Sequence, residues 1–176
     1  MATEQAQLKY QFINLTSKPT AQLCYSFSPS TSSSTSEPVL LVFVNGLGLP
    51  QAGWVPTIAK LREIRPKNLP AILTYDRFGQ GQTVDRDPAD ANASDASHGH
   101  DCISAVQDLR QLITQLACEK MGVREPDRVP LVLVSNSIGC ALARLYAQEH
   151  PGTVAGIVLL DSVLANLRFR VYLSGP

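Results

Sequence analysis

The chain has 176 residues, and its 15 Lys and Arg balance its 15 Asp and Glu, so the formal net charge is zero. This length suits one domain with a substantial core, and a balanced charge gives no reason to expect nucleic acid or an anionic membrane as a partner. The polar start predicts no secretory signal, and the apolar runs are too short to span a bilayer. Four dispersed cysteines, without a CxxC pair or a zinc-type cluster, predict reduced thiols, a cytoplasmic location, no metal and no other cofactor.

Two short segments near the N-terminus, 10–15 and 21–25, have strand character and are separated by a Ser-Lys-Pro turn signal. Residues 28–37 are rich in Ser and Thr and lack the apolar content needed to pack. They predict a flexible surface loop inside one domain that spans 1–176, rather than a linker between two domains.

From Pro38 onward, apolar strand-like runs alternate with segments of helical spacing. Such alternation predicts an α/β fold, with a mostly parallel sheet and helices on both faces. Asp101 is a candidate cap at the start of the longest helix, and Gly122 is its expected end. The expected strands are 39–44, 70–75, 131–134 and 154–160, and the expected helices are 54–64, 103–121 and 138–149.

The third of these strands runs into the next helix with no linker, through the segment Ser135 to Gly139. A direct strand-to-helix turn strains the residue at its centre and needs small residues two positions before and after it. Centring the turn on Ser137 puts Ser135 and Gly139 at those positions. Centring it on Ser135 would put the bulky Leu133 there. Ser137 is therefore the candidate nucleophile, and the alternative is that it only caps the following helix.

A serine nucleophile needs hydrogen-bond donors aimed at the oxyanion that forms on the attacked carbonyl. The backbone N–H of Ile138, just after the turn, is one candidate. The loop after the first buried strand contains Asn45, Gly46 and Leu47, and the N–H of Leu47 is the second candidate. The alternative for this loop is an ordinary glycine-rich turn between a strand and a helix.

Three segments together resemble the α/β-hydrolase superfamily, in the branch of small single-domain esterases, epoxide hydrolases and haloperoxidase-like enzymes. Asn45-Gly46 is similar to the His-Gly oxyanion segment of that family, with Asn in place of His. Residues 75–83 are similar to its D-x-x-G-x-G-x-S/T segment, in which Asp76 and Arg77 more often tie loops together than catalyse. Residues 135–139 match its G-x-S-x-G nucleophile elbow, with Ser135 replacing the first glycine.

The resemblance implies a catalytic acid and then a histidine on later loops. Asp161 ends the fourth expected strand and is an alternative position for the acid. His150 lies some three helical turns beyond Ser137, and a helix rises about 5.4 Å per turn, so its ring is far from the serine. His98 and His100 lie in a polar loop where the family does not place its base. Residues 163–176 could begin a lid segment or be unrelated sequence.

The sequence therefore predicts an α/β-hydrolase core that is C-terminally truncated, lacking its last strands and helices and exposing one sheet edge through which copies could associate. The first functional hypothesis is hydrolysis of an ester, lactone, thioester or amide of a small molecule in a small-molecule (secondary-metabolite) pathway. The second is a non-catalytic accessory or binding protein. A haloperoxidase-like or carrier-release role is a weaker third.

Overall fold

The computed structural model describes residues 7–31, 38–92 and 101–161. Within this part, six strands form one sheet in the order β1-β2-β4-β3-β5-β6. The first two strands are antiparallel to their neighbours, and the other pairs are parallel. The strands are β1 (Tyr10–Leu15), β2 (Lys18–Ser28), β3 (Leu40–Val44), β4 (Ala71–Tyr75), β5 (Leu131–Asn136) and β6 (Val154–Leu160).

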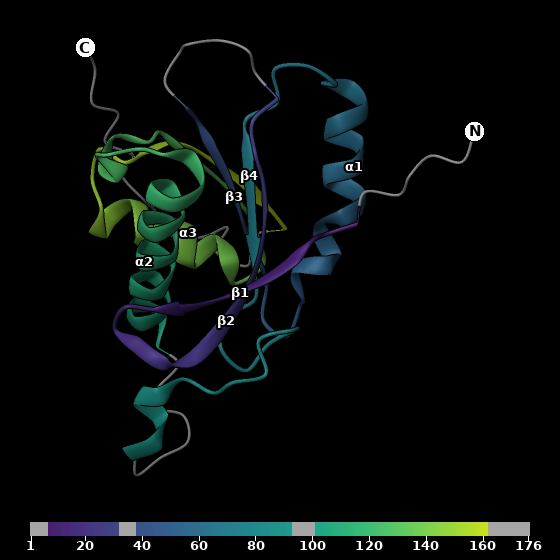
Figure 1. Ribbon diagram of the computed structural model, residues 1–176. Helices are drawn as coiled ribbons and strands as arrows, with labels where there is room; N and C mark the ends of the chain where they lie inside the picture. The colour runs from purple at the N-terminus through teal and green to yellow at the C-terminus, as the bar shows by residue number, and fades with distance from the viewer. Residues whose placement is uncertain (1–6, 32–37, 93–100, 162–176) are drawn as a thin grey trace.

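The helices cover both faces of the sheet (Figure 1), as the alternating pattern predicts. One face packs on η1 and α1, where Trp54 of η1 and Ile58 of α1 meet Phe43 of β3. The other face packs on α2 and α3 and forms the larger core, which includes Leu112 and Tyr146. The helices are α1 (Val55–Ile64), α2 (Cys102–Met121) and α3 (Gly139–Glu149), with short 3-10 helices η1 (Gln51–Trp54), η2 (Pro88–Asn92) and η3 (Pro126–Arg128).

Both expected ends of the longest helix are confirmed. The carboxylate of Asp101 accepts a hydrogen bond from the backbone N–H of Ser104, so Asp101 caps α2. Gly122 has a φ of 66° just after the last helical residue. This left-handed conformation favours glycine and ends the helix there.

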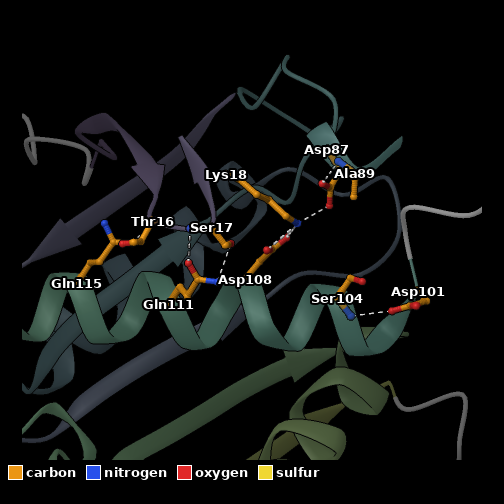
Figure 2. Close-up of polar contacts among 10 residues, drawn as sticks. All are labelled: Thr16, Ser17, Lys18, Asp87, Ala89, Asp101, Ser104, Asp108, Gln111 and Gln115. Carbon is orange, nitrogen blue, oxygen red and sulfur yellow. Dashed lines mark hydrogen bonds and ion pairs between the residues drawn. The ribbon is translucent and has the colours of Figure 1, made fainter. Parts of the chain in front are cut away.

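The N-terminal hairpin is longer than the sequence pattern predicts, and its turn is shorter: the predicted turn signal includes Lys18 and Pro19, but both belong to β2, which begins at Lys18. Side chains of α2 hold this turn in place: Gln111 both accepts from the Ser17 N–H at 3.0 Å and donates to the Ser17 hydroxyl at 2.7 Å (Figure 2). These contacts between residues far apart in the sequence extend the strand, and no local pattern could indicate them.

The predicted flexible loop 28–37 differs from the structure at its start. Ser28 is the last residue of β2, and Thr31 is bonded to Leu69 in both directions, through the Thr31 N–H at 2.9 Å and the Leu69 N–H at 3.0 Å. Residues 28–31 are therefore anchored to the segment that precedes β4. Residues 32–37 of the predicted loop lie outside the described residues.

β6 is less buried than its apolar sequence suggests. It pairs with β5 on one side only within the described part of the chain, and Val158 and Leu160 are more than 40% exposed. An apolar sequence alone does not distinguish a central strand from one at a sheet edge. Self-association through this edge stays a prediction. No helix among the described residues is long and apolar enough to cross a membrane.

Candidate active site

Ser137 occupies a strained turn between β5 and α3. β5 ends at Asn136 and α3 begins at Gly139, so two residues make the whole connection. Ser137 has a φ of 51°, in the left-handed region that costs a residue with a Cβ roughly 1–2 kcal/mol. Its backbone N–H donates to the carbonyl oxygen of Leu160 at 3.2 Å, which ties the turn to the end of β6.

The alternative that Ser137 caps the helix is wrong. The residue at the N-cap position of α3 is Ile138, and no side chain makes a capping hydrogen bond there. The strained backbone is therefore not explained by a capping role for the Ser137 side chain. The same backbone geometry is what a nucleophile turn requires.

The residues on either side of the turn are small for steric reasons, as the sequence predicts. A Cβ added to Gly139 would lie 2.5 Å from the carbonyl oxygen of Val44 and 2.8 Å from that of Asn45. Ser135 is fully buried, and its hydroxyl donates to the carbonyl oxygen of Val158 at 3.2 Å. α3 can therefore start against the end of β3 only because residue 139 has no side chain.

The loop after β3 approaches the candidate nucleophile closely. A Cβ added to Gly46 would lie 3.2 Å from the Cβ of Ser137. The guanidinium of Arg77 donates to the carbonyl oxygens of Asn45 and Gly46, each at 2.8 Å. All described peptide bonds are trans, so the Gly46 carbonyl and the Leu47 N–H point in opposite directions across one planar peptide. The bond from Arg77 to the Gly46 carbonyl therefore makes the Leu47 N–H point away from Arg77.

Asn45 occupies the position at which the α/β-hydrolase superfamily usually has histidine, and it has a structural role in this loop. It is 2% exposed, its amide donates to the carbonyl oxygen of Tyr75 at 2.9 Å, and its side-chain oxygen accepts from the indole N–H of Trp54. Asn45 therefore joins the ends of β3 and β4 to the start of the helical segment that follows.

The Asp76 carboxylate ties several loops together, as the sequence indicates. It is fully buried and accepts from the backbone N–H of Gln51 at 2.6 Å, from the Gln51 side chain at 3.0 Å and from the N–H of Gln82 at 2.9 Å. A Cβ on Gly81 would lie 2.4 Å from this carboxylate. Asp76 and Arg77 therefore support the site from beneath instead of entering it as reacting groups.

The candidate acid is less well placed. Asp161 directly follows β6 and is exposed, with a φ of 49°. The backbone bond between Ser137 and Leu160 brings its neighbour to the turn, but no described contact joins Asp161 to Ser137. Its role stays a prediction.

The described histidine, His150, follows the far end of α3 and packs its ring at 4.8 Å from that of Tyr146. Burial, and then the nearby Arg110 charge, lower the pKa of His150. α3 has 11 residues, so about 16 Å of helix separates its ends. His98, His100 and residues 163–176 lie outside the described residues. Among the described residues, no three His, Cys, Asp or Glu side chains gather as a metal site would require.

A charged cluster lies beside the site, and no pattern in the sequence indicates it. Lys18 contacts both Asp87 and Asp108 (Figure 2), and it bonds to the latter at 2.7 Å. Its ammonium also lies 5.1 Å from the centre of the Phe78 ring. These residues come from β2, the loop after β4, and α2. Since they are dispersed in the sequence and none of them belongs to a motif, only the fold brings them together.

The sheet order defines the chain as an α/β protein, and the strained turn at Ser137 lies at the carboxyl end of β5. A sequence model described as the alpha/beta hydrolase family matches residues 41–175. The chain belongs to the alpha/beta hydrolase family. No curated protein sequence matches it.

Solved structures share the fold at low sequence identity. A carboxyl esterase from Bacillus coagulans is 16% identical with a TM-score of 0.59, over 86% of this chain and 43% of that one. Cfl2 from Burkholderia cenocepacia is 16% identical with a TM-score of 0.60, over 95% and 48%. The epoxide hydrolase VrEH1 from Vigna radiata is 14% identical with a TM-score of 0.61, over 90% and 41%. The chain thus spans less than half the length of these proteins.

Proposed function

We propose that the chain carries the nucleophile of a serine hydrolase that acts on an ester, lactone, thioester or amide of a small molecule, in a small-molecule (secondary-metabolite) pathway. The observation that carries this proposal is the φ of 51° at Ser137. A strained backbone persists only where its surroundings enforce it, and such residues concentrate at reactive sites. Here Gly139 and Gly46 are the neighbours that allow the strained turn to pack.

In this proposal the Ser137 hydroxyl attacks the carbonyl carbon, a C–O bond forms, and the alcohol, thiol or amine leaves with the proton that serine gives up. The N–H groups of Ile138 and Leu47 donate to the oxyanion. Losing one such donor typically costs about 10²–10³ in rate. Water then releases the acid and restores the serine. Asp161 is the candidate acid of this site.

A second function is a non-catalytic accessory or binding protein of the same fold. The position of His150 favours it, because within the described residues the histidine that follows Ser137 lies at the opposite end of α3. Without a base beside it, a serine hydroxyl is a weak nucleophile.

Labelling with a fluorophosphonate probe, read by intact-protein mass spectrometry, separates the two functions. The proposed hydrolase takes up one label, Ser137→Ala takes up none, and Ser135→Ala labels like the parent because Ser135 is buried beneath the turn. An unlabelled parent chain, or equal labelling of Ser137→Ala, would show that Ser137 is not an activated nucleophile and would favour the accessory function.

A further inference from the structure

The loop that carries the proposed oxyanion donor Leu47 begins at Asn45, and the Asn45 side chain is bonded at both of its polar ends. Its oxygen accepts from the indole N–H of Trp54, and its amide donates to the carbonyl oxygen of Tyr75 at 2.9 Å. All three residues are at most 6% exposed, so water competes little for these bonds. The side chain of Asn45 is therefore held by two elements, the end of η1 and the end of β4.

Trp54 is itself anchored, so its indole can fix a neighbouring loop instead of following it. η1 begins at Gln51, which is fully buried. The backbone N–H and the side-chain amide of Gln51 donate to the Asp76 carboxylate at 2.6 and 3.0 Å, and its side-chain oxygen accepts from the Thr74 hydroxyl at 2.7 Å. The ring of Trp54 also packs on Phe43, with 5.0 Å between the ring centres. The indole is therefore held against β3 and β4.

Packing alone does not fix the side chain of Asn45. A pocket of about 230 Å³ is lined by Asn45 and Trp54, together with Pro50 and Thr57. This space has room for a side-chain amide, so an Asn45 that lost its bond to Trp54 could turn into it. The hydrogen bond from the indole is therefore needed to keep Asn45 in place.

From Asn45 the constraint passes along the backbone to Leu47. Arg77 donates to the carbonyl oxygens of Asn45 and Gly46, each at 2.8 Å. It can bond both at once only while Asn45 is in place, because the two carbonyls are joined through Gly46, whose backbone is the freest of any residue to rotate. Within the described residues, the N–H of Leu47 donates to no protein group, so no acceptor of its own sets its direction.

We propose that Trp54 is a positioning residue of the candidate active site. Through Asn45, its indole N–H holds the loop in the arrangement that points the Leu47 N–H toward the oxyanion position. The chemical purpose of this role rests on the proposed function. The direction of the Leu47 N–H does not depend on catalysis, so the two can be tested apart.

Trp54→Phe removes the donor and keeps a ring against Phe43, and two measurements on the full chain follow its effect. Residual dipolar couplings report the direction of each backbone N–H, and the coupling of Leu47 should shrink toward zero while those of β3 and β4 keep their values. Labelling of Ser137 by a fluorophosphonate should slow about fivefold, the effect of one hydrogen bond. Phe43→Leu is the matched control: it loosens the packing of Trp54 but spares the N–H, so it should lower stability to urea and change neither the Leu47 coupling nor the labelling rate.

A double substitution tests the route through Asn45. Asn45→Ala alone should also reduce the Leu47 coupling, and adding Trp54→Phe to it should have no further effect. A Leu47 coupling that Trp54→Phe leaves intact, an equal reduction in Phe43→Leu, or additive effects of Trp54→Phe and Asn45→Ala would overturn the proposal. If the parent takes up no fluorophosphonate but the Leu47 coupling shrinks in Trp54→Phe, the proposed hydrolase function fails and the positioning role of Trp54 stands.

Discussion

Arg77 and Gly46 are joined by a 2.8 Å hydrogen bond from the guanidinium to the backbone carbonyl, and this one contact sets the direction of the next peptide N–H. The same guanidinium also holds the Asn45 carbonyl at 2.8 Å. Two parallel bonds from a planar fork fix the loop more firmly than a single point charge can. In the proposed hydrolase, Arg77 is thus a positioning residue, which acts on the oxyanion through Leu47.

Arg77→Lys should therefore slow fluorophosphonate labelling of Ser137 about tenfold while the chain stays folded. Lysine keeps the charge but can bond only one of the two carbonyls. The Gly46–Leu47 peptide can then rotate, and its N–H no longer points toward the oxyanion position. Rates of labelling and urea unfolding would be measured together. Arg65→Lys, at an exposed site, is the control and should change neither. Equal labelling rates in Arg77→Lys and the parent would remove Arg77 from this role.

Gly139→Ala should destabilise the fold by about 1–3 kcal/mol or more, because the added Cβ would meet backbone oxygens of Val44 and Asn45 that cannot move aside. Urea unfolding followed by circular dichroism measures this loss. Gly156→Ala in β6 is the matched control, since its nearest neighbour is a Val132 methyl at 4.0 Å. A loss of the same size in both variants would mean that the close approach of α3 to β3 is not the cause.

Lys18→Met should cost about 3–5 kcal/mol, because it leaves the Asp87 and Asp108 carboxylates without the cation that both contact. All three side chains are at most 12% exposed. Lys60→Met is the control: its pair with Glu63 is exposed, and it should cost less than about 1 kcal/mol. Urea unfolding at neutral pH gives both values, and a similar small loss in the two variants would contradict the structural role of Lys18.

The cluster of Lys18, Asp87 and Asp108 also predicts that the stability of the fold depends on pH in the alkaline range. Burial alone would lower the pKa of Lys18, but its bonds to Asp108 and Asp87 outweigh burial and raise it above 10.5. A raised pKa in the folded state means that the contribution of Lys18 is complete below pH 10.5 and falls as the pH rises through the folded value. The stability difference between the parent and Lys18→Met should therefore shrink above pH 10.5. A difference that is constant to pH 12 would exclude this linkage.

The sequence predicts well those features that depend on neighbours in the chain. The caps at Asp101 and Gly122, the buried central strands and the small residues around Ser137 all follow from local geometry, and the structure has them. An exposed sheet edge is expected from the sequence, but the apolar run of β6 does not itself show which of its side chains are exposed, because such a run looks the same at the edge of a sheet as at its centre. The Lys18 cluster was missed because it is assembled from segments far apart in the chain.

The strain at Ser137 can be measured without any assay of activity. At a φ of 51°, a residue with a Cβ pays roughly 1–2 kcal/mol, whereas glycine pays only its greater loss of chain entropy, about 0.5–1 kcal/mol. Ser137→Gly should therefore be about 0.5–1 kcal/mol more stable to urea than Ser137→Ala, which lacks the hydroxyl but keeps the Cβ.

Asn68, at a φ of 62°, provides the comparison for this strain, because asparagine tolerates the left-handed region better than serine or alanine does. The stability to urea that Asn68→Gly gains over the parent should be smaller than the stability difference between Ser137→Gly and Ser137→Ala. If Ser137→Gly were no more stable than Ser137→Ala, the turn would carry no strain, and the main support for a nucleophile at this position would be lost. If it is more stable, the chain retains a serine there at a cost to its own stability, which is expected of a residue kept for its chemistry.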